Sequence, residues 1–171
     1  MTRDETIQAG RIPRWLMWTS IAAGFLLPFA VRLAAVLILQ PSRFVSDLAS
    51  LPHQLFAPGH NLFLVGILNL IPFLFLLLIS RLGFRRARQP KEKKWALISA
   101  LIAGSFALLA SLVVQAWVWL DVFSGHPSST GAMAFVVFPA FCMPAVMLVY
   151  SIALIAAWKR IYRKSSSMGG E

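Results

Sequence analysis

Residues Trp15 to Leu39, WLMWTSIAAGFLLPFAVRLAAVLIL, form a long apolar run with one charged side chain, Arg32. A helix of about 20 apolar residues crosses the roughly 30 Å hydrocarbon core of a bilayer. A secretory signal peptide has a shorter apolar segment, of about 7–15 residues, followed by a small-residue cleavage site. This run exceeds that length and no such site follows it. It therefore predicts a membrane span that is retained.

Three further apolar runs, Leu62 to Ser80, Trp95 to Leu120 and Ala132 to Trp158, have spanning length. Hydrophobic residues make up 58% of the chain and charged residues 13%, against about 45–50% and about 25% in soluble domains. We expect an all-α integral membrane protein with four transmembrane helices in one bundle. The predicted parts are a cytoplasmic tail (1–14), spans at 15–39, 62–80, 95–120 and 132–158, a basic cytoplasmic loop (81–94) and a basic tail (159–171).

The orientation follows from the positive charges. Fourteen of the sixteen lysines and arginines precede the first run, lie between the second and third, or follow the fourth. By the positive-inside rule both termini and loop 81–94 are cytoplasmic, as in a multi-pass protein of a bacterial inner membrane. Trp15, Trp18, Trp95 and Trp158 mark the inner boundary, and Trp117 and Trp119 the outer one.

Despite the net charge of +10, the basic segments are short and belong to no nucleic-acid-binding fold. They predict contact with anionic lipid headgroups on the cytoplasmic side and no nucleic-acid partner.

The first outer connection, residues 40–61, carries an apolar pattern of its own. Phe44, Leu48, Leu51 and Leu55 recur at spacings of three and four residues. This period is typical of one face of a helix, although Pro52 interrupts the segment. We expect a short helix lying in the outer membrane interface.

Arg32 is the one charge within a span, and its depth follows from the tryptophans. If Trp15 and Trp18 mark the inner boundary, about 30 Å of helix at about 1.5 Å per residue ends near Val36. Arg32 then lies roughly 6 Å below the outer boundary. Its guanidinium either reaches outward to lipid phosphate or water, or turns inward to Gln115 and Asp121.

Span three has small and polar residues at four-residue spacing: Ser99, Ala103, Ala107, Ser111 and Gln115. Small residues let helix backbones approach closely, so this stripe predicts a helix-packing seam. A solute pathway is the alternative interpretation.

Pro28, Pro72 and Pro144 fall near the membrane midplane in three different spans. Each proline removes a backbone hydrogen bond and frees a carbonyl that needs another donor. Asn69, one turn before Pro72, is well placed to supply one. We expect a hinge layer here; the alternative is the ordinary abundance of proline in membrane helices.

The sequence also excludes several chemistries. No Asp, Glu, Lys or His lies inside a span, so the buried carboxylate of the four-span drug-efflux proteins is missing. The aspartate pair of lipoprotein signal peptidases is absent, since only Asp121 is near the required depth. The single cysteine, Cys142, excludes a thiol oxidoreductase, and no G-x-S-x-G or H-E-x-x-H motif occurs. We predict no enzyme and no catalytic residues.

No cofactor is expected either, because no histidine lies within a span to bind haem. The outer connections contain His53, His60 and His126 with Asp47 and Asp121. Together these could hold a metal ion, but their spacing matches no ligand motif, so no metal site is predicted.

The layout of a basic tail, four spans, a basic middle loop and two outer loops resembles that of the immunity proteins that protect bacteria from pore-forming colicins. With the absence of catalytic motifs, it predicts a non-enzymatic inner-membrane protein acting through helix contacts with a membrane partner. Such a protein would be an accessory subunit, a regulator, an immunity-type protein or a homo-oligomer. The alternative is a small, oligomeric transporter or channel.

Overall fold

The computed structural model describes residues 12–56, 61–87, 89–123 and 129–166. Within these ranges the chain is helical and contains no strand. The elements are α2 (Arg14–Leu39), η1 (Pro41–Arg43), α3 (Phe44–Gln54), α4 (Leu62–Arg86), α5 (Pro90–Phe123) and α6 (Ser129–Ser166). Four of them, α2, α4, α5 and α6, are long and apolar enough to cross a membrane. Each predicted span falls within one of these four helices.

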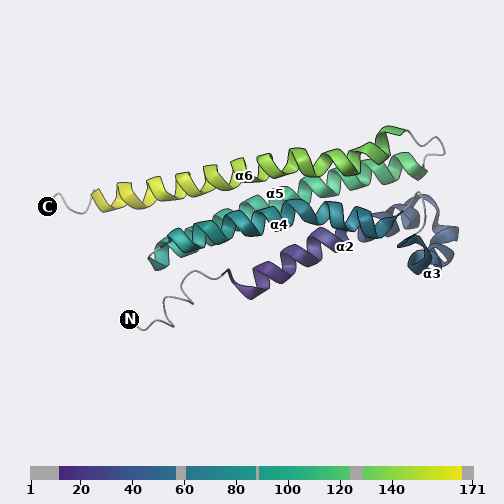
Figure 1. The fold of residues 1–171 in the computed structure, drawn as a ribbon, viewed down its shortest axis with the longest axis horizontal. Helices are drawn as coiled ribbons and strands as arrows, with labels where there is room; N and C mark the ends of the chain where they lie inside the picture. The colour runs from purple at the N-terminus through teal and green to yellow at the C-terminus, as the bar shows by residue number, and fades with distance from the viewer. Residues whose placement is uncertain (1–11, 57–60, 88, 124–128, 167–171) are drawn as a thin grey trace.

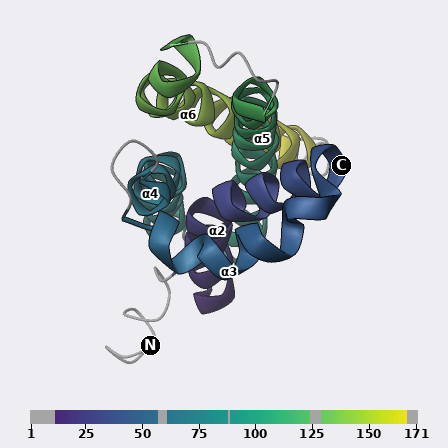
Figure 2. The same ribbon diagram turned by 90° about the vertical axis from the view of Figure 1, so that its right-hand side faces the viewer.

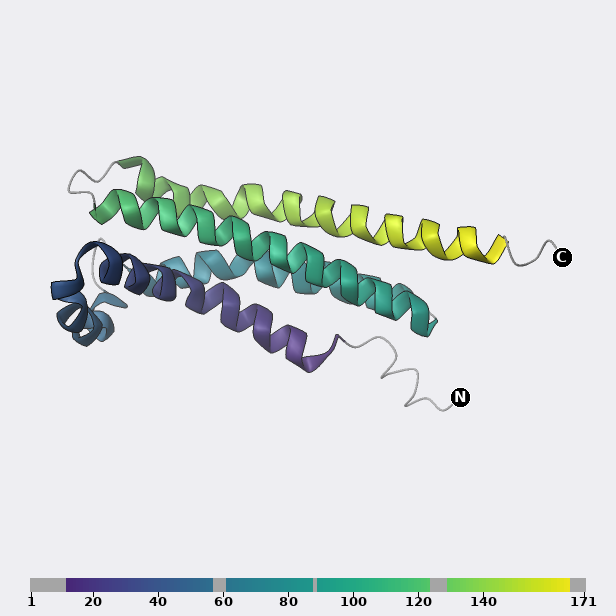
Figure 3. The ribbon, with the colours of Figure 1, turned by 180° about the vertical axis from the view of Figure 1, so that it is seen from behind.

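The four long helices lie side by side along the long axis of the molecule (Figures 1 and 3). The start of α2 and the end of α6 lie at the same end of the molecule (Figure 1). Helix α3 lies at the other end, against α2 (Figure 2). Helices α4 and α5 each contact the other three long helices. The end with α3 is called the outer end below, and the opposite end the inner end.

The predicted loop 81–94 is largely helical. Helix α4 continues to Arg86 and α5 begins at Pro90, so residues 87–89 alone separate them. Arginines in the last turn of α4 favour this extension because they complement the negative end of the helix dipole. Proline suits the first position of a helix, and the Glu92 carboxylate accepts a hydrogen bond from the Gln89 N–H at 3.1 Å.

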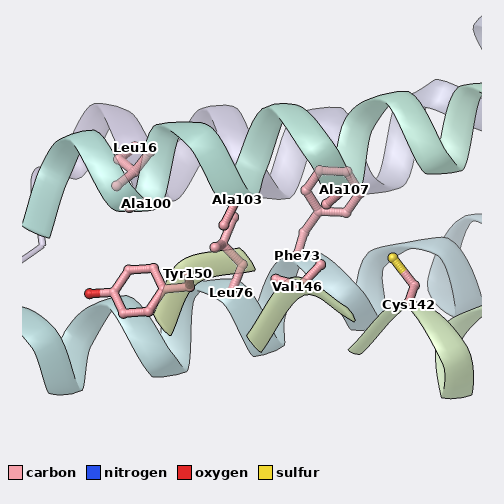
Figure 4. Close-up of a cluster of buried hydrophobic side chains, with 9 residues drawn as sticks. All are labelled: Leu16, Phe73, Leu76, Ala100, Ala103, Ala107, Cys142, Val146 and Tyr150. Atoms are coloured by element: carbon pink, nitrogen blue, oxygen red, sulfur yellow. The ribbon is translucent and has the colours of Figure 1, made fainter. Parts of the chain in front are cut away.

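The largest buried apolar cluster lies where α4, α5 and α6 meet, with Leu16 from α2 at its edge (Figure 4). Ala100, Ala103 and Ala107 of α5 are each 0% exposed. Their small side chains let the neighbouring helices approach, so that larger residues such as Leu76 and Val146 fill the remaining space.

One contact at the inner end of this cluster fixes the distance between α4 and α6. The Tyr150 hydroxyl occupies the place that a Cβ atom on Gly83 would take. Tyr150 is buried, and glycine is the residue that leaves room for its ring.

We predict that Gly83→Ala destabilises the protein by about 1–3 kcal/mol, the usual cost of overpacking. Adding Tyr150→Phe removes the clashing hydroxyl and should recover part of the loss. Unfolding in mixed micelles measures both variants.

Gly104→Ala is the matched control, because a Cβ there meets only the end of the Leu76 side chain at 3.3 Å. It should be neutral or stabilising by up to about 1 kcal/mol through helix propensity. Equal losses in the Gly83 and Gly104 variants would contradict the proposed contact.

Candidate functional site

Arg32 lies one helical turn after Pro28 on α2, and its side chain is 9% exposed. Its Nη2 donates a hydrogen bond to Asp47 Oδ1 at 2.8 Å, which forms an ion pair between α2 and α3. The two predicted alternatives for Arg32 were lipid or water on the outside and Gln115 with Asp121 on the inside, whereas the partner that the structure shows is Asp47. Removing a charge from water is costly unless a partner compensates it, and Asp47 supplies that compensation.

Helix α3 holds Asp47 in place through a local network. Gln54 Nε2 donates to Asp47 Oδ1 at 3.3 Å and to Ser50 Oγ at 2.6 Å. Ser50 Oγ in turn donates to the Asp47 backbone carbonyl at 2.9 Å. These residues are spaced by three and four positions, so they share one face of α3.

The polar face of α3 is turned toward Arg32, so that the Asp47 carboxylate reaches the guanidinium. Asp47 and Gln54 are half-buried, while Leu48, a residue of the predicted apolar face, is 48% exposed. The sequence signal for the polar face is the spacing of Asp47, Ser50 and Gln54.

Trp119 of α5 forms the third side of the site. The Arg32 guanidinium carbon lies 5.5 Å from the centre of the Trp119 ring, within the range of a cation–π contact. Trp119 is 3% exposed and packs against Phe123 and Phe135. Its neighbour Trp117, which was predicted like Trp119 to mark the outer boundary, is half-exposed.

The predicted hydrogen bond between Arg32 and Gln115 is not formed. Gln115 lies one turn before Trp119 on α5 and is 2% exposed, but its Oε1 has no hydrogen-bond partner among the described residues. Asp121 is half-buried and has an interaction of its own. The ionic partner of Arg32 that the structure shows therefore comes from α3, which neither predicted alternative included. We call Arg32, Asp47, Ser50, Gln54, Gln115 and Trp119 the outer cluster.

The second feature is a hydrogen bond between α2 and α4 in the middle of both helices. Pro28 has no N–H to donate to the Gly24 carbonyl, four residues earlier. Asn69 Nδ2 of α4 donates to this carbonyl instead, at 2.6 Å. Asn69 was expected to help one of the freed carbonyls, and the carbonyl that it satisfies is the one exposed by Pro28 on the neighbouring helix.

The two helices come very close here. A Cβ atom on Gly24 would lie 3.1 Å from the Leu70 Cα atom, and one on Gly66 would lie 3.2 Å from the Phe25 carbonyl oxygen. Of the predicted hinge layer, Pro28 and Pro72 are buried and Pro144 is exposed. The proline positions thus differ in their surroundings, and Pro28 is the one with a defined hydrogen-bonding replacement.

The predicted seam on α5 is buried along its whole length. Ser99, Ala103, Ala107, Ser111 and Gln115 are all between 0% and 2% exposed. The hydroxyls of Ser99 and Ser111 have no hydrogen-bond partner within the described ranges.

Of the three histidines in the predicted outer connections, the structure describes His53. His53 is exposed on α3, and His60 and His126 lie outside the described residues. The described part of the chain has no group of three histidine, cysteine or acidic residues that could hold a metal ion.

No protein-family model, curated protein or solved structure matches this chain. Its function has to be inferred from the outer cluster, the α2–α4 contact and the buried seam.

We predict that Asn69→Leu destabilises the protein by about 1–3 kcal/mol, because it leaves the Gly24 carbonyl without a donor. Pro28→Ala restores an N–H within α2 that can donate to this carbonyl. The double variant should therefore be more stable than Asn69→Leu alone when unfolding is measured in mixed micelles. If Pro28→Ala gives no recovery, the carbonyl is not the cause of the loss.

For the ion pair, Arg32→Met and Asp47→Asn should each lower the free energy of unfolding by about 3 kcal/mol. This is the lower end of the range for breaking a buried pair, because the Asp47 side chain is 17% exposed. The double variant Arg32→Met/Asp47→Asn should lose less than the sum of the two, because no unpaired charge remains.

Hydrogen exchange of the α3 amides should rise in both single variants, since the pair connects α3 to α2. Arg43→Met, which changes an exposed arginine at the start of α3, is the matched control and should leave exchange unchanged. Strictly additive losses in the double variant would show that Arg32 and Asp47 act independently.

Proposed function

We propose that the chain is a multi-pass protein of a bacterial inner membrane in which the four long helices form a bundle with both termini in the cytoplasm. The distribution of exposed charge supports this orientation. Exposed basic side chains gather at the inner end, where α4 ends and α5 begins: Arg81, Arg85, Arg86, Lys91 and Lys94. At that position they would contact anionic lipid headgroups.

In this orientation α3 lies in the outer membrane interface. Val45 of α3 and Phe56, just after it, are 76% and 66% exposed. Exposed apolar residues also end α2, where Ile38 is 77% exposed. An amphipathic helix places such a face at the boundary between headgroups and acyl chains, while its polar face stays on the protein.

Within the bundle, we propose a non-enzymatic role in which the lipid-facing surface contacts a membrane partner. The observation that carries this proposal is the tight packing of the interior. The α5 seam is at most 2% exposed, and α2 and α4 approach until the backbone at Gly24 lies against Leu70. Because the interior is filled, another helix can pack only on the outer surface, which consists of exposed apolar side chains.

The partner is a membrane protein or a second copy of the chain, so the protein would serve as an accessory subunit, a regulator or an immunity-type protein. The site residues fit this role. Arg32 of α2 is paired with Asp47 and holds α3 in place. The polar residues of the α5 seam are two buried serines and one buried glutamine.

A photo-crosslinking scan tests the proposal. A crosslinking amino acid replaces one lipid-facing residue on each helix: Leu26, Leu78, Leu109 or Phe141, which are between 54% and 73% exposed. We expect a protein adduct of one defined mass from one or two adjacent helices, because a packed partner covers one face of the bundle. The other positions are internal controls for random collision in the membrane.

Equal labelling by lipid at all four positions, with no adduct and no oligomer in mild detergent, would contradict a contact function. Solute flux into vesicles that contain the purified protein would instead favour the transporter or channel. If Ser111→Leu abolished that flux, the solute pathway would lie along the α5 seam, where Ser111 is 0% exposed.

A further inference from the structure

Four buried polar atoms of the outer cluster have no hydrogen-bond partner among the described residues. Two are donors, the Arg32 Nη1 and Trp119 Nε1 groups, and two are acceptors, Asp47 Oδ2 and Gln115 Oε1. Arg32 and Gln115 are more than nine-tenths buried. A buried polar group without a partner costs about 1–3 kcal/mol, and more when the group is charged.

These atoms come from three helices; three of the four residues are in contact, and the fourth, Gln115, lies one helical turn from Trp119. Arg32 contacts Asp47 at 2.8 Å on one side and the Trp119 ring at 5.5 Å on the other. Gln115 precedes Trp119 by one turn, a spacing that puts two side chains on the same face of a helix. The Arg32–Asp47 pair uses one nitrogen and one oxygen, so each partner keeps an atom for a further ligand.

The unpartnered groups specify the chemistry of that ligand. It has to accept hydrogen bonds from a guanidinium and an indole, and donate them to a carboxylate and an amide oxygen. Water has two protons and two lone pairs, and buried waters make about 2–4 hydrogen bonds to such groups. A lipid headgroup with an amine and a phosphate offers similar groups, but it stays attached to its acyl chains and needs an opening. The four atoms are enclosed by the protein, which favours water.

We propose that the outer cluster binds an internal water molecule. The water accepts hydrogen bonds from Arg32 Nη1 and Trp119 Nε1 and donates to Asp47 Oδ2 and Gln115 Oε1. It thereby connects α2, α3 and α5 and completes the hydrogen bonds of the ion pair.

The two adjacent tryptophans provide the test and its control. Nuclear Overhauser and rotating-frame cross-peaks between water and indole N–H protons are recorded on the ¹⁵N-labelled full-length protein in deuterated detergent. At the Trp119 indole, the signs of the two kinds of cross-peak should be those that a long-lived water gives. Trp117, which is 50% exposed, should show only short-lived contacts.

Two variants complete the test. Gln115→Leu removes one acceptor and should reduce the Trp119 cross-peak by at least about half, because a buried water depends on about three hydrogen bonds. Ser46→Ala, which removes a hydroxyl on the exposed side of α3 outside the outer cluster, is the matched control and should leave the cross-peak intact. Retained dispersion of the other indole signals shows that each variant is folded.

The wild-type spectrum decides the proposal even if a variant fails to fold. Absence of a long-lived water signal at Trp119 would overturn it. Cross-peaks from Trp119 to headgroup protons, after protonated phosphatidylethanolamine is added to the deuterated micelles, would also overturn it and assign the site to a lipid.

Discussion

The hydrogen bond from Asn69 to the Gly24 carbonyl is the interaction on which the packing of α2 depends. A backbone carbonyl freed by proline in an apolar environment requires a donor, because no water replaces the lost bond. Asn69 reaches it at 2.6 Å because Gly24 and Gly66 let the two backbones come together. Pro28, Asn69 and the two glycines therefore act as one unit. Pro28 frees the carbonyl, Asn69 supplies the donor, and Gly24 and Gly66 let the donor reach it.

The outer end is organised by a different principle. Arg32 and Asp47 are separated by fifteen positions in the chain, and their attraction folds α3 back against α2. Gln54 and Ser50 fix the carboxylate, and Trp119 covers the guanidinium. A buried ion pair gives little net stability compared with apolar residues of the same size. Its main effect here is to determine where α3 lies and which face it turns outward.

The sequence was sufficient to predict the four long helices, the short helix after the first span and the stripe of small residues on α5. These depend on local composition and periodicity, which the chain displays directly. The partner of Arg32 could not be predicted from depth alone. The tryptophan positions put Gln115 level with Arg32, but Asp47 lies in a connection whose path is set by tertiary contacts. The burial of Trp119 could not be predicted for a related reason, since an indole near the boundary can face either lipid or protein.

Helices α4 and α5 extend beyond the predicted spans into the basic connection. Arginine and lysine are good helix formers, and α4 ends at Arg86 while α5 begins at Pro90. Most of the basic side chains of this connection are therefore carried on the ends of two helices.

The rotation of α2 about its own axis limits which insertions and deletions the chain can tolerate. Gly24, Pro28, Arg32 and Val36 are all buried and follow one another at four-residue intervals. Inserting or deleting one residue among them would turn the rest of the helix by about 100°. Its contact with Asn69 and its pairing with Asp47 could not then both persist. Among homologous sequences, the segment from Gly24 to Arg32 should thus keep a constant length even where individual lipid-facing residues vary freely.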